Sequence, residues 1–243
     1  MNEIFLVNDN DSLPIVPETG PPSKTATLEA CSECKKASYK GNFVYPGAGF
    51  DGSYIDSLQK QLEEVGLQNV HVDRNGINGA QTQGNFLDAA AIMMLNDVFP
   101  GICEKPDNLH HIFRFPSEGQ QLNFIGYSYG GLVAAINAMQ YTNVKHEDVD
   151  HLVLIVTPIT KNNLALIQAN SRIKKAVIYD LIQHGDSVRA GLGRGELQKV
   201  FILVAGNFVF NQGEGHFYYA KEGPEGEARR KSLSQDLYSE GLR

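Results

Sequence analysis

The stretch LNFIGYSYGGLVAAINAM, residues 122–139, decides the fold of this chain. Leu122–Gly126 is a short and mostly apolar run with the length of a buried strand, and Leu132–Met139 has the small and apolar residues of a buried helix. The residues that join them, Gly126–Gly131, read GYSYGG and leave room only for a tight turn with Ser128 near its apex. The stretch therefore predicts a strand, a sharp turn and a helix in immediate succession.

The same alternation continues on both sides of this stretch. Strand-like apolar runs are expected at residues 42–45, 70–72, 152–156, 176–182 and 200–204, and helices at 54–65, 86–98, 163–168 and 225–238, the last of them charged and exposed. Apolar strands that alternate with helices are typical of an α/β protein with a mostly parallel central sheet and helices on both faces. The alternation covers residues 41–243 as one domain, whereas the proline-rich residues 1–40 predict an N-terminal arm.

The chemistry of a nucleophile explains the residue types around Ser128. A serine on a very tight turn projects its Oγ above the sheet edge, and flanking glycines leave room for the turned backbone and the following helix. The amino terminus of that helix directs N–H groups at a developing oxyanion. In this G-x-S-x-G motif and its setting, roughly residues 42–220 resemble the α/β-hydrolase family, in particular its small lipases and esterases. The resemblance implies that Ser128 is the nucleophile of a serine esterase or lipase.

A serine nucleophile needs a base, and the base needs an acid that orients it. In the α/β-hydrolase family these residues follow in the chain order Ser, Asp or Glu, His. The resemblance places the acid just past a late strand, where Asp186 lies in the sequence Gly-Asp-Ser-Val, with Asp180 as the alternative inside the strand pattern. It places the base on the loop after the last strand, where His216 lies. His184 is too close to Asp186 along the chain to serve as the base.

The resemblance also implies two backbone donors for the oxyanion. One is the N–H of Tyr129, directly after the nucleophile, and the other comes from the loop after an early strand. That loop reads PGAGF over residues 46–50, where the family usually has His-Gly. The second donor is therefore expected to be Ala48, with Phe50 as the alternative.

A second pattern in the chain points to a different class of protein. Gly47–Gly52 is a G-x-G-x-x-G that follows a strand and opens a helix, and Asp73 ends the next strand, as in a dinucleotide-binding site. Tyr141 and Lys145 form a Y-x-x-x-K after Ser128, which resembles the Ser–Tyr–Lys set of short-chain dehydrogenases/reductases. This alternative of an NAD(P)-binding protein does not explain the glycines around the serine or the later acid and base. The hydrolase is therefore favoured, and a hydrolase fold that binds without catalysis remains a third hypothesis.

The expected reaction is hydrolysis of a carboxylic ester through an acyl-enzyme, with no cofactor and no metal. Aromatic and apolar residues surround the candidate base in two groups, Phe208–Phe210 and Phe217–Tyr219. They fit either core packing beside a terminal strand or an acyl pocket with a lipid-facing rim. The second interpretation favours lipid-like esters, including phospholipids, allows transient contact with a membrane surface, and makes residues 159–172 the candidate cap.

Composition and charge exclude several other classes. A net charge of −7 argues against a general nucleic-acid binder. Three cysteines in 243 residues exclude a disulfide scaffold. The C-x-x-C of Cys31 and Cys34 lacks the second pair of ligands that a structural zinc site needs, so two incidental thiols are favoured over a redox pair or a metal site. No apolar run reaches the roughly 18 residues of a membrane span. No signal peptide is recognisable at the start, so the cytoplasm is the default compartment, although export without an N-terminal signal would leave the same pattern.

Overall fold

A computed structural model describes residues 40–47, 53–73, 121–197, 199–200 and 214–243 of the chain. Its five strands form one sheet in the order β2-β1-β3-β4-β5, and every neighbouring pair is parallel. The strands are β1 (Gly41–Tyr45), β2 (Val70–Val72), β3 (Leu122–Tyr127), β4 (Val149–Ile155) and β5 (Ile173–Tyr179). The prediction of an α/β protein with a parallel central sheet is confirmed.

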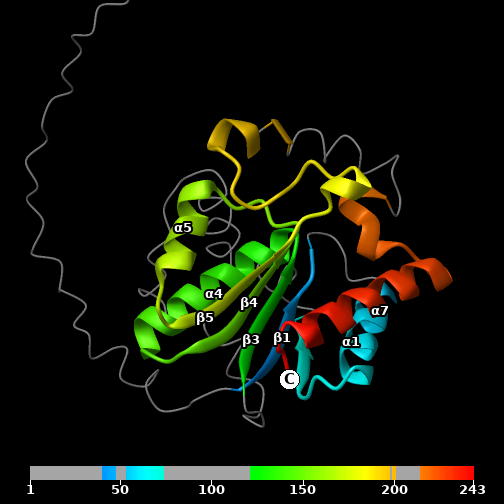
Figure 1. Cartoon of the computed structure of the whole chain (residues 1–243), viewed down its shortest axis with the longest axis horizontal. Helices are drawn as coiled ribbons and strands as arrows, with labels where there is room; N and C mark the ends of the chain where they lie inside the picture. The colour runs from blue at the N-terminus through cyan, green and yellow to red at the C-terminus, as the bar shows by residue number, and fades with distance from the viewer. Residues whose placement is uncertain (1–39, 48–52, 74–120, 198, 201–213) are drawn as a thin grey trace, which may run out of the picture.

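Helices cover both faces of the sheet (Figure 1). On one face lie α4 (Tyr129–Lys145) and α5 (Lys161–Ala169), and on the other α1 (Ser53–Glu64) and α7 (Gly223–Ser239). Successive residues of a strand point to opposite faces of the sheet. Because helices cover both faces, the residues that point to either face must be apolar. In β3, Phe124 packs in the core on the α4 side, whereas Ile125 packs in the core on the α1 and α7 side. The expected placement of helices on both faces is therefore confirmed.

The carboxyl ends of β1 and β3 meet where the chain changes direction across the sheet. From β1 the chain goes outward to β2, and it returns to the other side of β1 to form β3, β4 and β5. In open α/β sheets, ligands bind outside the carboxyl ends of strands at such a switch point. Tyr45, the last residue of β1, pairs with Gly126 of β3, so Ser128 lies just beyond this point.

Two elements differ most from their predicted bounds. α4 continues to Lys145, well past the expected end at residue 139. β5 begins earlier than expected, at Ile173, and ends at Tyr179, while the end of the predicted strand forms a short 3₁₀ helix, η6 (Ile182–His184). Leu181 is buried against the α1 and α7 side of the sheet, so its apolar character reflects packing after a bend and not continuation of the strand.

The helix predicted at residues 225–238 is confirmed by α7, but the prediction that it is exposed is wrong for the face that packs against α1. α7 packs against α1 and buries Leu233 and Leu237, each at most 1% exposed. Its buried positions have helical spacing but include a glycine, an arginine and a serine: Gly226, Arg230, Leu233, Ser234 and Leu237. Because three of these five residues are not large and apolar, hydrophobic periodicity alone does not reveal the buried face.

Several expectations fall outside the described residues. They are the N-terminal arm up to residue 39 with Cys31 and Cys34, the helix at 86–98 and the strand at 201–204. Val200, the first residue of that predicted strand, is helical. The domain boundary before residue 41 stays a prediction.

Candidate active site

Ser128 lies on the turn between β3 and α4, at the carboxyl edge of the sheet. Its φ of 54° and ψ of −122° form a combination that residues with a side chain rarely adopt. The Ser128 N–H donates to the carbonyl of Ile155 at 2.8 Å, and the Ser128 carbonyl accepts from the N–H of Gly131 at 2.9 Å. Such a strained turn between strand and helix exposes the serine Oγ above the sheet.

Three glycines at this turn are required by close packing. A Cβ on Gly126 would lie 2.4 Å from the carbonyl oxygen of Gly130, and a Cβ on Gly130 would lie 2.1 Å from that of Tyr45. A Cβ on Gly131 would lie 1.8 Å from Oγ1 of Thr157. The missing side chains therefore allow β1, β3 and the first turn of α4 to approach one another, as the sequence pattern predicted.

The candidate acid, base and nucleophile form one chain of hydrogen bonds. Oγ of Ser128 lies 2.6 Å from Nε2 of His216, and Nδ1 of His216 lies 2.9 Å from Oδ2 of Asp186. An ionised carboxylate only accepts hydrogen bonds, so Nδ1 is assigned the proton and Nε2 accepts from the serine hydroxyl. The structure thus brings together the three residues that the sequence selected.

Asp186 is held by the turn that follows η6. Gly185 precedes it with a φ of 82°, a left-handed conformation that a glycine adopts without steric cost. Oδ1 of Asp186 accepts a hydrogen bond from the N–H of Val188 at 2.8 Å, which leaves Oδ2 for His216. Asp186 is 5% exposed and His216 is 9% exposed. Because both are removed from water, their hydrogen bond is only weakly screened.

Asp180, the alternative acid, is directed elsewhere. Its Oδ1 accepts from the N–H of Ala190 at 3.3 Å, and the hydrogen bond to Nδ1 of His216 comes from Asp186. Burial raises the pKa of Asp180 above its ordinary value. Of the two candidate acids, Asp186 is the one that lies in position to orient the base.

Tyr127 contacts the candidate base, and the sequence analysis did not single it out. Its ring stacks on the imidazole of His216, with 6.0 Å between centroids and 20° between planes, and its hydroxyl donates to the His216 carbonyl. Burial raises the pKa of the Tyr127 phenol well above 10.0, and nearby Tyr54 and Asp186 raise it further. The phenol therefore stays protonated and able to donate. In the sequence, the one signal for Tyr127 was its position directly before Ser128. Its contact with His216 depends on the packing of a segment far along the chain.

Only one of the expected oxyanion donors lies in the described part of the chain. Tyr129 is the first residue of α4, so its N–H lies at the helix amino terminus, where the amides point away from the helix body. Ala48 and Phe50 lie outside the described residues. A Cβ on Gly130 would lie 2.3 Å from the carbonyl oxygen of Pro46, so the start of their loop lies against the first turn of α4.

The residues of the reductase pattern do not converge in the same way. Tyr141 lies inside α4, twelve residues after Tyr129, which corresponds to about 18 Å along the helix axis. Its hydroxyl donates to Glu147 at 3.1 Å, and only 1% of the residue is exposed. Lys145 is the last residue of α4, and the loop at 48–52 lies outside the described residues. Ser128 and Tyr141 are therefore too far apart to contact one small substrate.

The candidate cap, residues 159–172, packs on the α4 face of the sheet. Ile159 and Ile167 of the segment 159–172 are fully buried in the core on the α4 side, and Figure 1 shows α5 beside α4. The prediction of a cap over the site is wrong, because the apolar residues of this segment cover a sheet face. Of the aromatic residues expected near the base, Phe217–Tyr219 lie in the 3₁₀ helix η7 (Gly215–Ala220), and residues 208–210 lie outside the described part.

Metal and membrane features were searched in the same described ranges. These ranges contain no group of three or more His, Cys, Asp or Glu residues placed to hold a metal ion. None of the helices described there has the length and apolar character needed to cross a membrane.

Comparison with known proteins gives no match to this chain, neither to a protein-family model, nor to a curated protein, nor to a solved structure. Its function is therefore argued from the geometry of the site.

Proposed function

We propose that this protein is a serine hydrolase of the α/β-hydrolase fold that cleaves carboxylic esters. The observation that carries the proposal is the continuous hydrogen-bond chain from Asp186 through His216 to Ser128. The three residues come from separate turns, after β3, after β5 and in η7, and they follow the chain order of the α/β-hydrolases. The strained backbone of Ser128 and the close-packed glycines around it support a nucleophilic role.

The proposed reaction proceeds through an acyl-enzyme. His216 Nε2 takes the proton of the Ser128 hydroxyl as Oγ attacks the ester carbonyl, and Asp186 orients the imidazole and stabilises the imidazolium. The N–H groups of Tyr129 and Ala48 hold the oxyanion, where loss of one donor would cost about 2.7–4 kcal/mol in the barrier. His216 then protonates the leaving alcohol, and a water molecule activated by His216 releases the acid from Ser128.

The proposed substrates are apolar, lipid-like esters, including phospholipids. Three aromatic residues, Phe217–Tyr219, directly follow the base, and Phe217 is only 6% exposed. Ile182, in the turn before the acid, is 52% exposed. An exposed aliphatic side chain on η6, which contacts η7, fits contact with a lipid chain or a membrane surface.

Covalent labelling tests the proposed nucleophile. A fluorophosphonate probe should label the wild-type protein and should not label Ser128→Ala. His216→Ala should label far more slowly, because the serine loses the base that accepts its proton. A folded wild-type protein that does not react with the probe would overturn the proposed function.

A series of p-nitrophenyl esters tests the substrate class. With acetate, butyrate and octanoate, kcat/KM should rise with acyl chain length, since a longer chain buries more apolar surface. The fastest turnover on acetate would contradict the lipid-like class and leave the hydrolase itself intact.

The described contacts favour neither alternative function. An NAD(P)-binding protein would need Ser128 and Tyr141 beside one cofactor, and they lie several helical turns apart. Tight binding of NADPH in a fluorescence titration would support the NAD(P)-binding alternative. Binding of an ester without turnover would instead support the third hypothesis, a hydrolase fold that binds its ligand without catalysis.

A further inference from the structure

A stack of three side chains joins the turns that carry Asp186 and His216. His184 precedes the acid by two residues and Tyr218 follows the base by two, and their rings stack with centroids 3.8 Å apart and planes 23° apart. Cζ of Arg229 lies 3.9 Å from the centroid of the Tyr218 ring. Two groups at these distances cannot share one ring face, so Arg229 covers the face opposite His184. We call His184, Tyr218 and Arg229 the aromatic stack.

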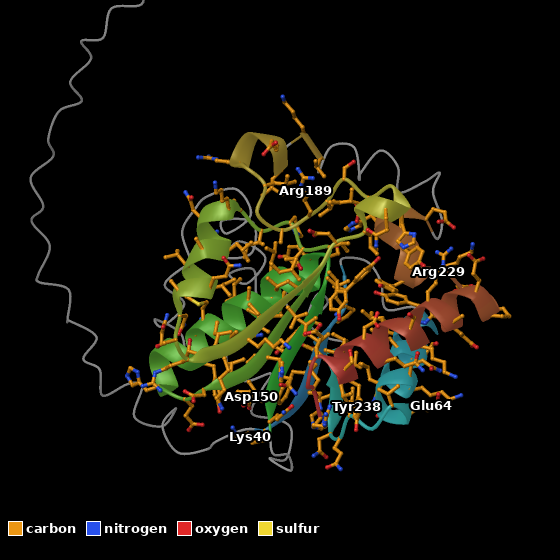
Figure 2. The ribbon with its side chains drawn as sticks, in the orientation of Figure 1. Lys40, Glu64, Asp150, Arg189, Arg229 and Tyr238 are labelled. Atoms are coloured by element: carbon orange, nitrogen blue, oxygen red, sulfur yellow. The ribbon has the colours of Figure 1, made fainter. Side chains whose placement is uncertain are left out.

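Arg229 anchors the aromatic stack on α7. Its Nη2 donates to Glu214 at 2.9 Å and to Glu225, and its Nη1 donates to the Tyr218 carbonyl at 3.1 Å. Only 10% of the side chain is exposed. Figure 2 shows Arg229 at the end of α7 that lies beside η7. A guanidinium fixed by two carboxylates and a carbonyl holds the Tyr218 ring in one orientation.

The two turns need such a connection because short 3₁₀ helices carry them. A strand is fixed by a ladder of backbone hydrogen bonds along its length, whereas η6 and η7 are three and six residues long. The hydrogen bond between Asp186 and His216 can be aligned only if both turns keep their separation. A misplacement of about 1 Å in a catalytic group can cost on the order of 100-fold in rate.

We propose that the aromatic stack is a positioning device that sets the separation between Asp186 and His216. This inference rests on the proposed function, since it assigns the stack a role in the same hydrolytic site. The three residues act through the acid and the base, so they are positioning residues. His184, which the sequence excluded as a base, gains its role from its place two residues before the acid.

Substitutions that remove or retain a ring test the aromatic stack. Tyr218→Ala and His184→Ala should lower kcat for a p-nitrophenyl ester by about tenfold or more with KM changed less than about twofold. Tyr218→Phe and His184→Phe keep a flat ring and should stay within about twofold of wild-type kcat.

Proton NMR gives a second measurement, because the Nδ1–H of His216 bound to Asp186 should have a downfield resonance that disappears in Asp186→Asn. That resonance should shift or broaden in the alanine variants and persist in the phenylalanine variants.

Tyr238→Ala is the matched control on the same helix. The guanidinium of Arg243 lies 4.1 Å from the centroid of the Tyr238 ring, and Figure 2 shows Tyr238 at the opposite end of α7 from Arg229. Removal of this ring should change neither kcat nor the downfield resonance. If Tyr218→Ala fails to fold, His184→Ala carries the test, because His184 lies outside α7 and η7.

The outcomes separate this inference from the proposed function. If both alanine variants keep wild-type kcat and resonance while Ser128 reacts with the probe, the inference is overturned and the hydrolase stands. If the wild-type protein neither reacts with the probe nor hydrolyses esters, the proposed function fails. The NMR resonance then tests the inference by itself. An unchanged signal in both alanine variants overturns the inference, and a shifted or broadened signal supports it.

Discussion

At the scale of single residues, the two candidate acids show how different surroundings give identical side chains different properties. Asp186 uses one oxygen for His216 and the other for the N–H of Val188. Asp180 accepts from the N–H of Ala190, and burial raises its pKa. The Asp186 carboxylate is placed to stabilise a positive imidazolium. Burial destabilises the charged form of the Asp180 carboxylate.

Asparagine substitutions should distinguish their roles in catalysis. Asp186→Asn should lower kcat by about 10⁴-fold, because an amide in this position favours the wrong imidazole tautomer. Asp180→Asn should leave kcat unchanged, since its carbonyl oxygen can still accept from the Ala190 N–H. Steady-state ester hydrolysis measures both effects, and equal losses would contradict the assignment of the acid.

Asp180→Asn should also stabilise the protein in a pH-dependent way. Burial raises the pKa of Asp180 in the folded state, while the unfolded state titrates near 3.9. Between these two values the folded state binds more protons, so the wild type loses stability as the pH rises through this window. The substitution should therefore raise the free energy of unfolding at about pH 7, and the gain should vanish below about pH 4. Urea unfolding between about pH 4 and pH 7 tests this prediction. A gain in the free energy of unfolding that does not vary with pH would argue against burial of the Asp180 carboxylate as its cause.

The glycines at the serine turn give a prediction on stability. Gly130→Ala should lower the free energy of unfolding by about 1–3 kcal/mol, because the new Cβ overlaps a backbone oxygen that cannot rotate away. Gly195→Ala is the control, since Gly195 is also helical and a Cβ there meets nothing within 4 Å. Urea unfolding should show a loss in the first variant and no loss in the second. Similar values for both would contradict the packing argument.

At the scale of elements, α7 contacts η7, the short helix that contains the candidate base His216. Arg230 is 2% exposed, and its Nη1 donates to the carbonyls of Tyr219 at 2.8 Å and Lys221 at 2.7 Å. Its Nε donates to Oγ of Ser57 on α1 at 3.0 Å. One guanidinium thus joins α7, η7 and α1, beside the place where Arg229 anchors the aromatic stack.

Arg230→Met should test this connection between elements. Methionine retains much of the apolar stem but leaves the partly buried carbonyls of Tyr219 and Lys221 without this donor, at up to about 1–3 kcal/mol for each. Lys231→Met is the control on the next, exposed position and should change stability little. Chemical unfolding compares the two variants, and an equal effect would show that the buried hydrogen bonds do not matter.

At the scale of the whole molecule, buried polar side chains cross the sheet at the end opposite Ser128. Nδ2 of Asn123 donates to Oδ1 of Asn42 at 2.8 Å, and Nδ1 of His151 lies 2.8 Å from Oδ1 of Asn123. Nδ2 of Asn42 also donates to the carbonyl of Arg243 at 2.9 Å. The row joins β1, β3 and β4 to the last residues of the chain, so these distant segments are held together by buried hydrogen bonds.

This row predicts a loss of stability at acidic pH. Burial lowers the pKa of His151, and the charge of Lys175 lowers it further. The unfolded state titrates near 6.5, so as the pH falls below about 6.5 it takes up a proton that the folded state does not bind. The His151 contribution should therefore be constant at alkaline pH and decline on acidification. Urea unfolding between about pH 5 and pH 8 should show a shallower decline for His151→Gln, and equal slopes would contradict the prediction.

Local patterns were sufficient to predict the five described strands and the turn that carries Ser128, but not the order of the strands in the sheet. An apolar strand, a glycine-flanked serine and a helix of small residues are neighbours in the chain, so residues 122–139 contain the information for their own turn. The choice of Ser128, Asp186 and His216 in that order rests on the resemblance to the α/β-hydrolases, which needs no distances. Packing altered the ends of β5 and α4 and buried α7, since side chains from other elements decide which residues are covered.

Tertiary structure alone decided how the candidate base is held. Tyr127 contacts His216 across 89 positions of the chain, and Arg230 bonds to Ser57 across 173 positions. The stack of His184 on Tyr218 likewise joins two turns that no local periodicity connects. A sequence pattern can show which residues share a strand, helix or turn. The contacts that keep a catalytic group within fractions of an ångström of its partner form only when distant segments pack, and the chain order of these residues gives no signal of them.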